Sequence, residues 1–130
     1  MGFLAVVVAG IAGFAFGAVW YTVLANPWMA ASGVPVVDGK PANQANPVPY
    51  ITSIVGSILV AGMMRHVFVL SGIDTFGEGL VSGFGVGLFL VSPWIATFYG
   101  FSARPFRLTL IDAGYATFGC TVIGAVLMLF

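Results

Sequence analysis

The sequence predicts an all-α integral membrane protein, an up-down-up-down four-helix transmembrane bundle. Only 6% of the 130 residues are charged, whereas a soluble domain carries about a quarter. Four apolar stretches cover residues 3–25, 50–70, 79–99 and 107–130. Each has at least the ~20 residues that a helix needs to cross the ~30 Å hydrocarbon core of a bilayer. These spans and their connections use the whole chain, which predicts a single membrane domain over residues 1–130.

The spans are predicted to be helices rather than barrel strands. Backbone polar groups inside a bilayer must be paired within the protein, which leaves helices and closed barrels. Barrel strands alternate apolar and polar residues, but residues 6–8, 58–60 and 126–129 are unbroken apolar runs. Helices therefore fit the pattern better.

The connections predict the order of the helices and their orientation. The first connection, residues 26–49, is rich in proline and glycine, which favours turns and extended backbone. The connections at residues 71–77 and 100–106 are short, so sequential helices should be antiparallel neighbours.

Three of the four basic residues, Lys40, Arg104 and Arg107, lie in or beside the first and third connections, and Arg65 lies on the other side. Basic residues favour the cytoplasmic side of a membrane. We therefore expect both connections to be cytoplasmic, and both termini to lie outside.

Small residues recur at helical spacing and predict close helix packing. Gly79, Gly83 and Gly87 share one face of the third span, and Gly13 and Gly17 share one face of the first. Membrane helices associate where small residues let their backbones approach, as in a glycine zipper. The simpler interpretation is packing inside the bundle, which needs several such seams. A surplus stripe facing outward would instead bind a partner.

Aromatic residues suggest interface anchors. Trp28 and Trp94 are expected at the level of the lipid headgroups. Each follows a proline and a pair of glycines at the same offsets, 66 residues apart. This repeat indicates either a duplicated hairpin or the ordinary composition of membrane helices.

Charged residues near the turn between the second and third spans predict an ion-pair clamp that holds this hairpin. Arg65 lies near the outer end of the second span, and Asp74 and Glu78 follow across a short turn. An ion pair from Arg65 to either carboxylate would pin the hairpin.

Asp112 is the charge that hydrophobicity does not explain. It lies about two turns into the fourth span, with Tyr115 on its face and Arg107 close in sequence. A charge within a span is a candidate functional site, so these three residues form a candidate polar site. Asp112 is either a proton or cation ligand, or a buried carboxylate paired with Arg104, Arg107 or a loop amide.

The sequence predicts no catalytic or metal site. His66 and Cys120 are the only residues of their types and lie in different spans, so neither a nucleophile–base pair nor a protein-only metal site is expected. No cofactor is expected, apart from lipid, quinone or pigment contributed by a partner complex. The net charge of zero argues against nucleic acid as a partner.

Two motifs resemble a known family. Residues 17–24 with the Pro27-Trp28-Met29 tripeptide, and residues 110–115 leading to residues 123–125, resemble the first-span and last-span signatures of the bacterial domain of unknown function 1761 family. The resemblance implies a small four-span protein of the bacterial inner membrane with no established activity. It also implies that Asp112 and Tyr115 form a pair throughout the family.

Two functions are expected from these observations. The first is a small structural or accessory subunit, not an enzyme, that packs laterally with partner membrane proteins or with itself in the lipid bilayer. The alternative is a small transporter or channel with a polar site at Asp112 and Tyr115.

Overall fold

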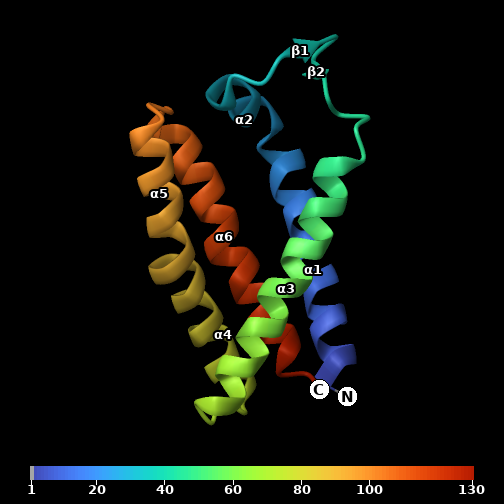
Figure 1. Cartoon of the computed structure of the whole chain (residues 1–130), viewed down its shortest axis with the longest axis vertical. Coiled ribbons are helices and arrows are strands. Elements are labelled where there is room, and N and C mark those ends of the chain that lie inside the picture. Colours follow the sequence, from blue (N-terminus) through green and yellow to red (C-terminus); the bar gives the residue numbers. More distant parts are fainter. Residues whose placement is uncertain (1) are drawn as a thin grey trace.

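Within residues 2–130, four long apolar helices, each antiparallel to the next along the chain, confirm the predicted all-α bundle (Figure 1). The computed structural model describes residues 2–130. The helices long and apolar enough to cross a membrane are Gly2–Val23, Val48–Leu70, Phe76–Phe101 and Phe106–Leu127. The first of these helices begins, and the last of them ends, at the same end of the bundle (Figure 1).

Helix α6 (Phe106–Leu127) is the centre of the bundle. It packs along α1 (Gly2–Val23) and along α4 (Phe76–Gly85), and it also touches α3 (Val48–Leu70). In contrast, α3 packs mainly on α1 and makes no substantial seam with α5 (Ser92–Phe101) within the described part of the chain. Helices α3 and α5 therefore diverge toward the end opposite the termini (Figure 1).

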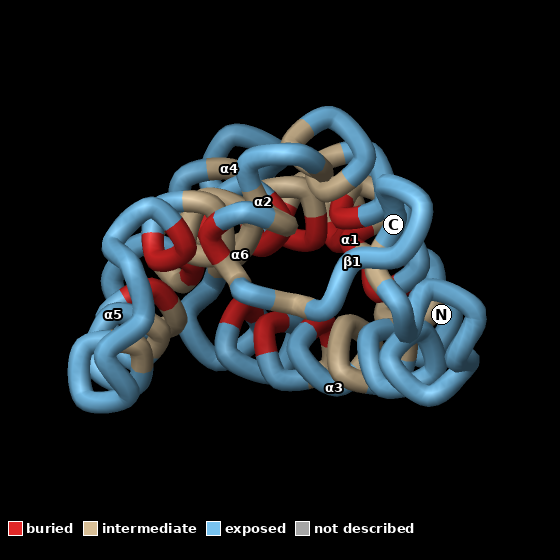
Figure 2. The backbone as a smooth tube through the Cα atoms, turned by 90° about the horizontal axis from the view of Figure 1, so that it is seen from above, coloured by how far each residue is buried: buried red, intermediate tan, exposed pale blue. Residues whose placement is uncertain are grey.

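The buried core lies at the end of the bundle that holds the termini. It is built where α1, α3 and α6 converge, and the buried stretches of backbone lie on the sides of these helices that face the interior of the bundle (Figure 2). Phe68 of α3 is its largest fully buried side chain. The core consists of Ala5, Ala9, Ala61, Met64, Phe68, Cys120, Ile123 and Leu127.

The first connection holds more helix than its composition predicts. Residues 25–32 form α2 (Ala25–Ser32), which ends at Gly33 with φ of 71°. The prediction of turns and extended backbone was wrong here because Pro27 lies in the first turn of α2, where a backbone N–H has no partner in the helix. Beyond Gly33, β1 (Val36–Val37) and β2 (Lys40–Pro41) pair antiparallel.

The third span is interrupted, which its apolar pattern did not predict. A π-helical segment, η1 (Val86–Val91), separates α4 from α5. Pro93 follows it, and proline lacks the N–H that continues a regular helix. The Ser92 hydroxyl stabilises the break by donating to the carbonyl of Gly87 at 2.7 Å. π-Helical turns widen a helix and recur at functional sites.

A capping box closes the turn before α4. The Thr75 hydroxyl accepts from the Glu78 N–H at 3.2 Å, and Glu78 Oε1 accepts from the N–H groups of Thr75 and Asp74 at 3.1 and 3.2 Å. The predicted clamp assigned Glu78 and Asp74 to Arg65, but the Arg65 guanidinium lies against Gly2 at the start of α1. This hairpin is thus held by helix capping. The acidic Glu78 in the first turn of α4 also interacts favourably with the positive end of the helix dipole.

Replacing Thr75 by alanine should destabilise the hairpin by about 1 kcal/mol, the usual effect of losing an N-cap side chain. The midpoint of unfolding in dodecyl sulfate mixed micelles would measure this. Thr97→Ala is the matched control, because that exposed hydroxyl only donates to the carbonyl four residues earlier in α5. Equal midpoints for the two variants would contradict the capping role.

Candidate functional site

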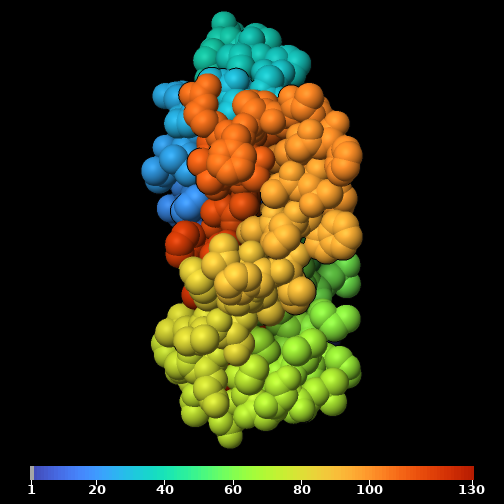
Figure 3. All heavy atoms as spheres, turned by 90° about the vertical axis from the view of Figure 1, so that its left-hand side faces the viewer, coloured from blue at the N-terminus to red at the C-terminus, as the bar shows by residue number. Residues whose placement is uncertain are grey.

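A cavity of about 930 Å³ lies between the helices at the end opposite the termini. Residues of α1, α2, α3, η1, α5 and α6 line it, and Pro41, Asn43 and Gln44 of the first connection line its outer side. In the space-filling view the first connection forms the top of the molecule, above the ends of α5 and α6 (Figure 3). The cavity exists because α3 packs on α1 rather than on α5, which leaves space between α3 and α5.

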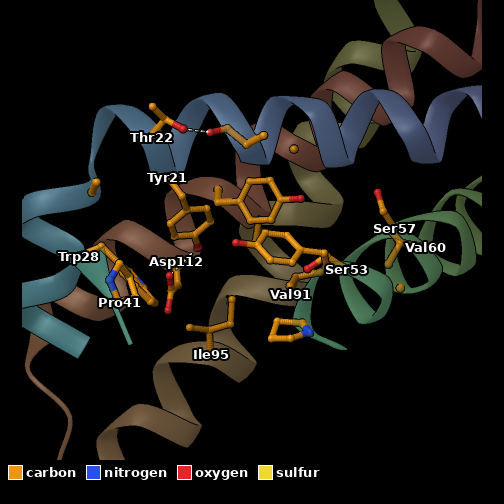
Figure 4. A pocket seen from close by; sticks show the side chains of 18 of the residues that line it. Tyr21, Thr22, Trp28, Pro41, Ser53, Ser57, Val60, Val91, Ile95 and Asp112 are labelled. Carbon is orange, nitrogen blue, oxygen red and sulfur yellow. Dashed lines mark hydrogen bonds between the residues drawn. The ribbon is translucent and has the colours of Figure 1, made fainter. Parts of the chain in front are cut away.

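Asp112 lies on the wall of this cavity and is held by two tyrosines from other helices. The Tyr21 hydroxyl of α1 donates to Asp112 Oδ1 at 2.5 Å, and the Tyr99 hydroxyl of α5 donates to Asp112 Oδ2 at 2.6 Å. Figure 4 shows Tyr21 directed toward Asp112, with Trp28 and Pro41 to one side. The half-buried carboxylate thus joins α1, α5 and α6.

The arginines that could neutralise Asp112 have other surroundings. The Arg104 guanidinium donates to the backbone carbonyl of Ser32 at the end of α2. Arg107 is exposed at the start of α6 and does not line the cavity. The hydrogen bonds described for the Asp112 carboxylate come from phenols.

Tyr115 shares the cavity with Asp112, but its hydroxyl points elsewhere. It donates to the backbone carbonyl of Gly13 at 3.1 Å. Its ring meets that of Tyr21 edge-on, with centroids 5.4 Å apart, and packs against Gly17. Tyr115 therefore supports Tyr21 and α1, while Tyr21 and Tyr99 contact Asp112 directly.

The two Pro-Trp sequences lie in different environments. Trp28 is half-buried, lines the cavity and meets Tyr21 edge-on at 6.1 Å. Trp94 is 62% exposed and stacks on Phe98 on the outside of the bundle. Only Trp94 therefore has the outward position expected of an interface anchor.

The five glycines of the predicted stripes all face other helices within the bundle. A Cβ atom at Gly13 would lie 2.8 Å from Ile123 and Ser57, and one at Gly17 would lie 2.8 Å from Tyr115. Gly79, Gly83 and Gly87 lie against the α6 backbone at Gly124, Cys120 and Thr117 respectively. None of these stripes is left over for a partner.

Sequence reasoning missed Tyr21 and Tyr99 as partners of Asp112. Both resemble ordinary tyrosines of a membrane interface. The available signal was their level in the membrane. Tyr21 and Tyr99 each lie two residues before the end of their helices, and those ends are on the side of the membrane where α6 begins.

The arrangement is suited to binding. Residues 2–130 hold no group of three or more His, Cys, Asp or Glu side chains that could hold a metal ion. The cavity instead combines one carboxylate with phenol and indole rings in a largely apolar lining. Such a wall can hold a positively charged or hydrogen-bond-donating molecule.

Comparison with known proteins places the chain with one family. A protein-family model matches residues 4–128, and its description is "Protein of unknown function (DUF1761)". No curated protein and no solved structure matches the chain.

Proposed function

The chain belongs to the DUF1761 family, whose description names no activity, and we propose that it is a small membrane transporter with its substrate site at Asp112. The proposal rests on one observation, a cavity of about 930 Å³ that contains a carboxylate within a membrane span. Binding sites for small molecules typically occupy ~300–1,000 Å³. Ionisable groups within spans are costly and commonly mark substrate pathways.

The cavity geometry favours a carrier over an open channel. Cys120 and Ile123 belong both to the cavity lining and to the buried core. Below them the core fills the space between α1, α3 and α6 down to Ala5 and Phe68. Passage would therefore require the helices to rearrange, as in alternating access.

An accessory or scaffold subunit has less support as a function. That hypothesis drew in part on glycine seams left free for a partner, and the predicted stripes pack inside the bundle. The apolar outer surface suits lipid and does not by itself indicate a protein partner. Stoichiometric co-purification of another membrane protein in mild detergent would favour the subunit function.

We place the transporter in the bacterial inner membrane, with residues 26–49 and 100–106 on the cytoplasmic side. This orientation rests on Lys40, Arg104 and Arg107, because basic residues favour the cytoplasmic side of a membrane. The cavity lies at the same end of the bundle as these two connections. Its outer side would then face the cytoplasm.

Asp112→Asn should strongly reduce transport while leaving the bundle assembled. Purified protein in liposomes would be tested for saturable uptake of a panel of cationic, neutral and anionic small molecules. Uptake by wild type should fall by about tenfold or more in the variant, because interactions with a charged acceptor contribute about 1.5–3 kcal/mol.

Asp38→Asn is the matched control, since Asp38 is exposed in the turn between β1 and β2 and does not line this cavity. It should transport like wild type. Absence of saturable uptake for every class of compound, or wild-type uptake by Asp112→Asn, would refute the proposed transporter.

A further inference from the structure

We infer that the cavity selects organic cations, namely ammonium or phosphonium compounds with apolar substituents. This inference rests on the proposed function and names its substrate class. Two independent features of the cavity wall carry it: the sign of its charge and the number of its aromatic rings.

Asp112 is the only charged residue among the described residues that line the cavity. Lys40, Arg104 and Arg107 lie near the same end of the bundle, but none of them is part of the lining. A lone negative charge in surroundings less polar than water attracts a cation more strongly than it would in bulk solvent. An anion would be repelled by Asp112 and would meet no basic residue on this wall.

Several aromatic rings line the same cavity as the carboxylate. The lining includes Trp28 and the four tyrosines of the sequence, Tyr21, Tyr50, Tyr99 and Tyr115. Ring faces attract cations through their quadrupole, and walls of this kind recognise quaternary ammonium groups. Indole is the best of these rings, and Trp28 packs against Tyr21, the direct partner of Asp112.

The tyrosine hydroxyls are already engaged as donors. Tyr21 and Tyr99 donate to Asp112, Tyr115 donates to the Gly13 carbonyl, and Tyr50 donates to the Gln44 carbonyl at 2.9 Å. The phenols therefore offer rings and oxygen lone pairs, and not hydrogen-bond donors, to a molecule in the cavity. This polarity again suits a cation and not a carboxylate or phosphate.

The rest of the lining suits apolar substituents. Val60 of α3, Val91 of η1, Ile95 of α5 and Ile123 of α6 contribute aliphatic surface to the cavity. Burying such substituents contributes about 25 cal/mol for each Å² removed from water. A hydrophobic cation would thus gain from both the carboxylate and the walls.

Tetraphenylphosphonium and tetraphenylborate test this inference, because they have nearly the same shape and opposite charge. Equilibrium dialysis with the full chain in detergent should show saturable binding of tetraphenylphosphonium, whereas tetraphenylborate, dialysed separately under the same conditions, should show none. Asp112→Asn should weaken this binding by about tenfold or more. Asp38→Asn should leave it unchanged.

Trp28 and Trp94 provide a matched pair for the aromatic wall. Trp28→Leu should weaken tetraphenylphosphonium binding by about threefold to tenfold, whereas Trp28→Phe, which retains a ring, should change it by about twofold or less. Trp94→Leu should bind like wild type, because Trp94 lies outside the cavity. Equal losses in Trp28→Leu and Trp94→Leu would overturn the role of the aromatic wall.

The outcomes separate the two proposals. Asp112-dependent uptake of neutral or anionic compounds, without binding of tetraphenylphosphonium, would overturn the cation inference and leave the transporter standing. Absence of saturable uptake for every compound would refute the transporter, even if tetraphenylphosphonium bound at Asp112.

Discussion

Replacing Gly83 by leucine should separate α4 from α6 and destabilise the bundle by about 3 kcal/mol or more, the upper range for overpacking a well-filled interface. A Cβ atom at Gly83 would overlap the carbonyl oxygen of Cys120 and lie 3.1 Å from the Cα atom of Thr121. These obstacles are backbone atoms, which cannot rotate away as a flexible side chain could. The helices must therefore move apart.

Gly85→Leu is the control for this substitution. Gly85 lies on the same helix, but no atom comes within 4 Å of a Cβ atom built there. Leucine favours a helix over glycine by up to ~1 kcal/mol, so Gly85→Leu should be neutral or slightly stabilising.

Cys120 provides the measurement, because it is the sole cysteine, is 6% exposed and lies on the seam itself. Its labelling by a maleimide should accelerate in Gly83→Leu and stay at the wild-type rate in Gly85→Leu. Slow labelling and a normal unfolding midpoint in Gly83→Leu would contradict close packing at this seam.

For the glycines of the third span, the sequence predicted the packing face but not the helix that packs against it. The spacing of Gly79, Gly83 and Gly87 identified one face of the third span. It could not identify α6 as the neighbour, because α6 meets that face with backbone at Gly124, Cys120 and Thr117 and not with a matching glycine stripe. Backbone surface leaves little pattern in a sequence.

For Asp112, the sequence identified the residue but not its partners. Its charge within an apolar span was conspicuous, so the candidate residue could be chosen from the sequence. Its partners could not, since Tyr21 and Tyr99 are 91 and 13 residues away along the chain and resemble ordinary interface tyrosines. Electrostatics predicts that the nearby arginines pair with Asp112, yet Arg104 donates to the carbonyl of Ser32 at the end of α2 instead.

Neither the cavity nor the interruption of the third span could be predicted from the spacing of apolar residues. Hydrophobic spacing shows that helices exist, but a cavity depends on how far α3 and α5 diverge. Residues 86–91 are as apolar as the rest of the span, so the π-helical segment has no signal of its own apart from Pro93 nearby.

The tyrosine pair at Asp112 should be the main polar tie between α1, α5 and α6. Hydrogen bonds to charged groups contribute about 1.5–3 kcal/mol each, so Tyr21→Phe and Tyr99→Phe should each lower the free energy of unfolding by about that amount. The double variant should lose more than the sum, because it leaves the carboxylate without either phenol. Tyr50→Phe should have a small effect, since its exposed hydroxyl donates to the Gln44 carbonyl.

A double-mutant cycle with Asp112→Asn isolates the contribution of the carboxylate. In the Asp112→Asn background the remaining group is neutral, and a neutral hydrogen bond contributes only about 0.5–1.5 kcal/mol. Removing either phenol should therefore cost less in that background than in wild type, as measured by unfolding in mixed micelles. An equal cost in both backgrounds would mean that the stabilisation by these hydroxyls does not depend on the charge of Asp112, because phenylalanine keeps both rings in place. In that case the hydroxyls of Tyr21 and Tyr99 would link α1 and α5 to α6 as neutral hydrogen-bond donors, and the carboxylate would add nothing to this link.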